Sequence, residues 1–120
     1  MAPLTDPERL FAYTDALKNW SYSGYVRFEL TDHAYEWLRR ELNGLLPREL
    51  SRLMHEYVSL GGEIDEVAET RPQWSGSYPY HYDLRLSIEG KPVYIESRLH
   101  YCRPVLPDES WIKVVNIHAP

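Results

Sequence analysis

The sequence has a single cysteine, Cys102, among its 120 residues. One cysteine cannot form an internal disulfide, and it excludes the four-cysteine zinc patterns. The chain also lacks any run close to the roughly 20 apolar residues that a membrane-spanning helix needs. Its first residues, Met-Ala-Pro-Leu-Thr-Asp, are neither basic nor followed by an apolar stretch. We therefore expect no signal peptide, no membrane contact and a cytoplasmic location.

Positive charge is also in short supply. The chain carries 13 Lys and Arg against 18 Asp and Glu, which gives a formal net charge of −5 and a pI near 5.5. This balance disfavours broad electrostatic binding to nucleic acid, and we expect no DNA partner. An acidic surface of this kind favours a basic partner.

Motifs for phosphate and metal binding are missing as well. Gly61-Gly62 lacks the spacing of a phosphate-binding loop and is more simply a helix stop. No His-Glu-x-x-His motif or other close ligand pair on a helix occurs, so we expect no metal and no cofactor. Histidines and carboxylates can nevertheless ligate zinc or another transition metal. The neighbours of Cys102 match no family of nucleophilic cysteines.

The residues that are present indicate one folded domain with helices first. An apolar fraction of 43% and an aromatic fraction of 13% exclude a disordered chain, and the length allows a single core. Residues 25–30 are ambiguous and could form an extended edge segment. Apolar residues at helical spacing predict three helices: about 6–19, from Thr31 or Asp32 to Gly44, and from Pro47 to Gly61-Gly62.

After Gly62 the apolar period changes to two, which is typical of strands. The expected strands cover 63–71, 81–88, 93–100 and 111–118, with loops at 72–79 and 103–110. We therefore predict an α+β fold in which three N-terminal helices pack on one face of a four-stranded antiparallel sheet. Residues 1–120 form a single domain in this prediction, with a helical part at about 6–60 and a sheet part at about 63–118.

The hairpin from Tyr80 to His100, which turns at Glu89-Gly90, has two chemically different faces. Its apolar face holds Tyr82, Leu84, Leu86, Ile88, Val93, Ile95 and Leu99. The opposite face, called the polar face below, holds His81, Asp83, Arg85, Tyr94, Glu96, Arg98 and His100. These groups can transfer protons or hold anions. Alternatively, their charges form a cross-strand ion-pair lattice of the kind that a solvated sheet face carries.

A core follows from the same patterns. We expect burial of nine side chains, namely Trp37, Leu38, Leu42, Leu53, Tyr57, Leu84, Leu86, Ile95 and Leu99.

Outside the hairpin, His33 stands in the first turn of its helix. The helix N-terminus favours a neutral imidazole that could serve as a base, and the alternative is a surface histidine in a capping region. Arg71, at the end of the first expected strand, could join the arginines of the polar face in binding a phosphate.

Asn116 and His118 end the last expected strand and share a face with Ile112 and Val114 under strict alternation. Alternation alone does not decide which face of this strand is buried. If the side chains of Val115 and Ile117 point into the core, Asn116 and His118 join the polar face. Alternatively, these two residues belong to a frayed chain end and have no role in a site.

The residues Thr31-Asp32-His33-Ala34, which open a helix, are similar to the histidine-alanine opening of BrnT-like toxins. With a second helix that ends at Gly61-Gly62 and four antiparallel strands, residues of roughly 30–118 resemble the RelE/BrnT-type toxin ribonucleases of the barnase–colicin–RelE grouping. The resemblance implies metal-independent RNA cleavage, in which a base activates a ribose 2′-hydroxyl against the adjacent phosphate and cations stabilise the transition state. It also implies an RNA substrate and a cognate antitoxin.

The resemblance gives His33 the place of the family's helix histidine. The site residues on the strands are assigned from the sheet face that they share and not from a motif. The expected catalytic residues are His33, Arg85, Arg98, His100 and His118, with Arg71, Tyr94 and Asn116 at the substrate. A different class of function stays open beside this one. It is a non-catalytic binding or immunity-type module whose acidic surface meets a basic partner.

Overall fold

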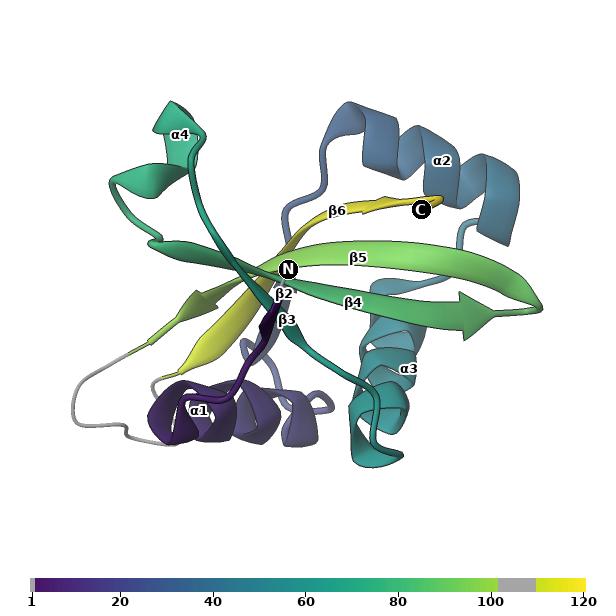
Figure 1. Cartoon of the computed structure of the whole chain (residues 1–120). Coiled ribbons are helices and arrows are strands. Elements are labelled where there is room, and N and C mark those ends of the chain that lie inside the picture. Colours follow the sequence, from purple (N-terminus) through teal and green to yellow (C-terminus); the bar gives the residue numbers. More distant parts are fainter. Residues whose placement is uncertain (1, 102–109) are drawn as a thin grey trace.

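The hairpin that the alternating sequence predicts is the centre of the fold (Figure 1). In this computed structural model, which describes residues 2–101 and 110–120, β4 (Tyr80–Ile88) pairs antiparallel with β5 (Lys91–His100). The two strands are joined by Glu89 and Gly90, whose φ angles of 53° and 78° belong to the mirror-image turn that matches strand twist. β6 (Trp111–His118) pairs antiparallel with the other edge of β5.

Three shorter strands extend this centre into a six-stranded sheet of order β1-β3-β4-β5-β6-β2. β3 (Asp65–Ala68) pairs with β4, and β1 (Ala2–Pro3) pairs with β3, both antiparallel. β2 (Val26–Phe28) pairs parallel with β6. The predicted four-stranded antiparallel sheet is therefore wrong, because the sheet has six strands and is mixed. Strands of two and three residues are too short to show an alternating pattern, and a parallel pairing depends on tertiary contacts.

The three long helices begin where the sequence predicts. They are α1 (Pro7–Lys18), α2 (Asp32–Leu42) and α3 (Pro47–Ser59). The Asp6 carboxylate caps α1 by accepting a hydrogen bond from the Arg9 amide, and the Thr31 hydroxyl caps α2 by accepting one from the Ala34 amide. None of the described helices is long and apolar enough to cross a membrane.

A fourth helix, α4 (Pro72–Ser75), occupies the predicted loop. It lies on the opposite side of the sheet from α1 (Figure 1), so the predicted number of three helices is wrong and the second face of the sheet also carries a helix. A helix of four residues makes one turn, which is too short for a repeating apolar pattern.

The core lies between the long helices and the apolar face of the hairpin. Of the nine side chains expected to be buried, six are, namely Leu38, Leu42, Leu84, Leu86, Ile95 and Leu99. Trp37, Leu53 and Tyr57 are only partly buried and pack against the core from its rim. The predicted loop at 103–110 and Cys102 fall outside the described residues, apart from Ser110.

A register shift in β6 decides which face of the last strand is buried. Ile95 pairs with Ile117, but Ser97 pairs with Val114, so β6 holds one residue more than β5 at this point. As a result, Val114 and Ile117 are both fully buried in the core. Strict alternation, which groups Asn116 with Val114, fails here.

Candidate functional site

Four charged side chains form a closed ring of ion pairs on the polar face. The Arg98 guanidinium lies 2.8 Å from both Glu69 and Glu96, and the Arg71 guanidinium lies 2.9 Å from Glu69 and 2.6 Å from Glu96. Two positive and two negative charges alternate around the ring, so it is neutral. The Arg98 side chain is 0% exposed and Glu69 is 1% exposed, whereas Arg71 remains 41% exposed. The ring is therefore closed to solvent except at Arg71.

α4 covers this ring. The Trp74 ring lies 4.9 Å from the Arg98 guanidinium carbon, which makes a cation–π contact. Burial opposes ionisation of the Glu69 carboxyl, but hydrogen bonds from Arg71 and the charges of Arg98 and Arg71 outweigh burial and lower its pKa to about 2. Glu69 therefore stays ionised at neutral pH, as the ring requires.

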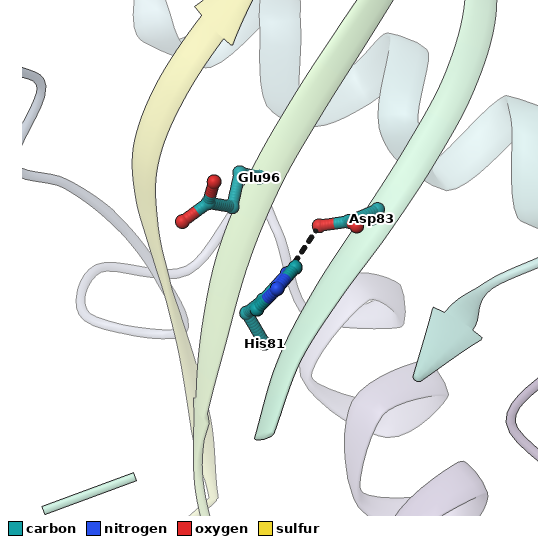
Figure 2. A group of neighbouring side chains, drawn as sticks. All are labelled: His81, Asp83 and Glu96. Carbon is teal, nitrogen blue, oxygen red and sulfur yellow. Dashed lines mark hydrogen bonds and ion pairs between the residues drawn. The ribbon is translucent and has the colours of Figure 1, made fainter. Parts of the chain in front are cut away.

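Beside the ring lies a group of three possible metal ligands, His81, Asp83 and Glu96 (Figure 2). His81 and Asp83 stand two residues apart on β4, and Glu96 faces Asp83 across the β4–β5 pair. The imidazole Nδ1 of His81 lies 2.8 Å from Asp83 Oδ1. The Asp83 side chain is 0% exposed, and its second oxygen, Oδ2, makes no hydrogen bond with the described residues.

Further along the polar face, Tyr94 contacts Arg85 and His118. The Tyr94 and His118 rings stack with centroids 4.8 Å apart, and the Arg85 guanidinium carbon lies 5.5 Å from the Tyr94 centroid. Burial raises the pKa of the Tyr94 phenol, and the neighbouring Asp83 carboxylate adds to this shift. Arg85 also donates to Asp65 Oδ2 at 3.0 Å. This group holds three of the expected site residues.

The expected histidines do not converge. His33 lies exposed in the first turn of α2 and makes no hydrogen bond, ion pair or ring contact with the described part of the chain. His100 stacks on Trp111 with ring centroids 5.0 Å apart, whereas His118 pairs with Tyr94, six residues earlier on β5. At about 3.3 Å per residue, His100 and His118 stand roughly 20 Å apart along the strand.

The remaining expected residues are divided between two places. Arg71 and Arg98 belong to the neutral ring. Asn116 faces Glu96 across the β5–β6 pair, and its side-chain oxygen accepts a hydrogen bond from the amide of Ile117. The structure therefore assembles the arginines with carboxylates rather than with histidines.

Sequence reasoning gave no role to Glu69 or Trp74. It placed His81, Asp83 and Glu96 on the polar face but did not name them as site residues. The signal for Asp83 and Glu96 lies in the turn, because a two-residue turn that pairs Ile88 with Lys91 also sets Asp83 opposite Glu96. Two carboxylates directly opposite each other repel, so a compensating cation is required nearby. Glu69 and Trp74 carry no comparable signal, since their segments reach the polar face only through tertiary folding.

A second candidate surface is an apolar groove between β2, α2 and the start of α3. Its volume is about 330 Å³. Tyr35, Glu36 and Arg39 line the groove from the exposed side of α2, and Leu46 lies next to it in sequence. The Tyr35 and Leu46 residues are 53% and 66% exposed. The apolar lining consists of Phe28, Leu30, Leu38, Leu45, Pro47 and Leu50.

Comparison of the chain with protein-family models, with curated proteins and with solved structures finds no match. The resemblance to the RelE/BrnT-type ribonucleases therefore stays a prediction. Function is argued below from the geometry of the chain itself.

Proposed function

We propose that the protein is a non-catalytic binding module that docks a basic segment of another protein in the groove between α2 and α3. The observation that carries this proposal concerns the sheet arginines. Arg71, Arg85 and Arg98, which RNA cleavage would need as cations, each contact at least one carboxylate of this chain. They are already neutralised before any phosphate arrives.

A phosphate on the polar face would meet unfavourable charges. The carboxylates of Glu69 and Glu96 already balance the charges of Arg71 and Arg98, so the ring offers a phosphate no net positive charge. The Asp83 carboxylate beside the ring would repel a phosphate. General acid–base cleavage also needs two proton-transfer groups within reach of one phosphate. The separation of His100 from His118 does not meet this requirement. These points favour the binding module over the ribonuclease.

The groove supplies the positive argument. Contiguous exposed apolar surface with a polar rim is typical of a protein-interaction site. Tyr35 presents a large, half-exposed side chain there, and Tyr is among the residues enriched in binding hot spots. The formal net charge of −5 favours a basic partner by steering its approach. We therefore infer a partner segment that places an apolar side chain in the groove and surrounds it with Lys or Arg.

The test uses two fluorescently labelled helical peptides of identical apolar pattern, one with Lys and one with Glu at its polar positions. Fluorescence anisotropy should show that the wild-type protein binds the Lys peptide at least 10-fold more tightly, and that added salt weakens this binding. Tyr35→Ala should weaken it about 5- to 30-fold, the range for a side chain worth roughly 1–2 kcal/mol. Leu60→Ala is the matched control, because Leu60 is 88% exposed and lies outside the groove.

Equal binding of both peptides, or equal weakening by Tyr35→Ala and Leu60→Ala, would contradict the proposal. A second arm incubates the same preparations with total RNA at low and high salt, where we expect the RNA to stay intact. Cleavage by the wild type that His118→Ala abolishes would overturn the binding module in favour of the ribonuclease.

A further inference from the structure

We propose that His81, Asp83 and Glu96 form a binding site for one divalent transition-metal ion, of which Zn²⁺ is the probe. This inference goes beyond the binding module, because the three residues lie on the polar face and none of them lines the groove. The sequence analysis expected no metal, since it searched for ligand pairs on one helix. Here the ligands come from two neighbouring strands.

The backbone brings the three ligands together. His81 and Asp83 project from the same face of β4, and Glu96 projects beside them from the facing position of β5 (Figure 2). Each residue offers one ligand atom, and these atoms all lie within 4.8 Å of one another. Zinc bonds to nitrogen and oxygen of about 2.0–2.2 Å place ligand atoms roughly 3–4 Å apart, so the side chains need to close in by about 1 Å.

An independent observation points to a ligand at this place. Asp83 is 1% exposed, and its Oδ2 atom is buried without a hydrogen-bond partner among the described residues. Buried carboxylates are normally paired, hydrogen-bonded or bound to a metal, because an unsatisfied buried charge is costly. His81 bonds only Oδ1, and the Tyr94 phenol, which also interacts with this carboxylate, makes no close hydrogen bond with Oδ2. A cation between the three side chains would satisfy the remaining oxygen.

The charges around the site favour a cation. The ring of Arg71, Glu69, Arg98 and Glu96 is neutral, so the Asp83 carboxylate adds one net negative charge when the His81 imidazole is neutral. Both arginines contact Glu96 through Oε2, which leaves Oε1 as the available ligand atom. The two guanidinium groups also repel a metal ion. We therefore expect weaker binding than at a structural zinc site.

The donor set indicates the class of metal. One imidazole and two carboxylates suit zinc and similar transition metals, whereas Mg²⁺ and Ca²⁺ prefer oxygen ligands alone. Three protein ligands leave a further coordination position for water or another ligand. The His81 side chain is 15% exposed, so an ion has a route from solvent.

The experiment uses the untagged full-length protein after dialysis against a chelator. Isothermal titration with Zn²⁺ should show one equivalent bound, and Mg²⁺ should bind at least 10-fold more weakly. His81→Gln should weaken Zn²⁺ binding at least 10-fold. His100→Gln should bind like the wild type, because His100 lies on the same face but stacks on Trp111. Circular dichroism of each variant checks the fold.

A thermal melt provides a second readout, since an ion that binds only the folded state raises the melting temperature. Excess Zn²⁺ should raise the melting temperature of the wild type and of His100→Gln but not that of His81→Gln. Absence of a stoichiometric site in the wild type would overturn the proposal, as would a site that His81→Gln leaves intact. Neither result bears on peptide binding in the groove, so the two proposals fail separately.

Discussion

Arg98 provides the sharpest test of the ion-pair ring, through the substitution Arg98→Met. Methionine keeps the apolar length of the side chain and removes the charge. Glu69 and Glu96, whose side chains are 1% and 8% exposed, then retain Arg71 as their one cationic partner among the described residues. Removing one partner from a buried ion pair costs about 3–5 kcal/mol, because the other charge is left uncompensated.

Two features of the structure adjust this magnitude. Arg71 keeps its contacts with both carboxylates, which moderates the loss. The guanidinium is also imperfectly satisfied in the wild type, since its Nε and Nη2 make no hydrogen bond with the described residues, although Nη2 lies 2.8 Å from Glu69 as an ion pair. We therefore expect a loss of about 3 kcal/mol, at the lower end of the range for buried pairs.

The assay is urea unfolding followed by tryptophan fluorescence, because Trp74 packs directly on Arg98. Arg39→Met is the matched control. Its side chain is 74% exposed and its ion pair with Glu36 lies within one helix, so we expect a change below about 0.5 kcal/mol. Adding Glu69→Gln and Glu96→Gln to Arg98→Met should recover at least half of the loss, since replacing every charged partner is far less costly than replacing one. A loss below about 1 kcal/mol, or no recovery in the triple variant, would refute the reasoning.

Three further predictions concern the core, the ring and the hairpin turn. Leu84→Ala should lower the free energy of unfolding by about 2–5 kcal/mol in urea melts, because Leu84 is 0% exposed. A loss as small as that of the exposed control Leu60→Ala would contradict the place of Leu84 in the core. The lowered pKa of Glu69, about 2 against an ordinary 4.5, adds stability that is fully present above about pH 5 and is lost as the pH falls through 4.5 towards 2. Melts from pH 6 to pH 2 should show this loss, roughly 2–3 kcal/mol, and Glu69→Gln should flatten the profile. Glu89→Asn should raise the melting temperature and increase the free energy of unfolding by about 0.5–1 kcal/mol, because Asn tolerates the positive φ of 53° better than Glu. A lower melting temperature would contradict this account of the turn.

The sequence predicted the long elements well because their side-chain patterns repeat. The expected strand at 111–118 coincides with β6, and the hairpin strands differ from β4 and β5 by one and two residues at their starts. β1 and α4 escaped prediction because two to four residues cannot show a period. β2 lies within residues 25–30, which the sequence left ambiguous as a possible extended edge segment, and it is an edge strand of the sheet. The pairing of β2 with β6 joins segments that are about 85 residues apart, and no local pattern encodes it.

The sequence predicted which hairpin side chains share the polar face, but not which residues from other segments contact them. Alternation placed Arg98 and Glu96 correctly on one face, where the alternative interpretation, an ion-pair lattice, describes their contacts. It did not reveal that Arg98 is fully buried, because the cover comes from Trp74 in a segment expected to be a loop. The register shift in β6 likewise moved Asn116 away from the face of Val114. A bulge adds a residue without leaving a mark in the apolar pattern.

The ring and the neighbouring carboxylate pose different physical problems, and this difference bears on function. Glu96 is balanced by Arg98 and Arg71 within the fold, so its burial needs no outside partner. Asp83 faces Glu96 from the next strand. The imidazole of His81 bonds its Oδ1 and the Tyr94 phenol also interacts with this carboxylate, whereas Oδ2 makes no close hydrogen bond with the described residues. Like charges directly opposite on paired strands are destabilising unless something offsets them. A structural role alone would be served as well by an uncharged residue at position 83, whereas a cation bound between His81, Asp83 and Glu96 gives that carboxylate a use.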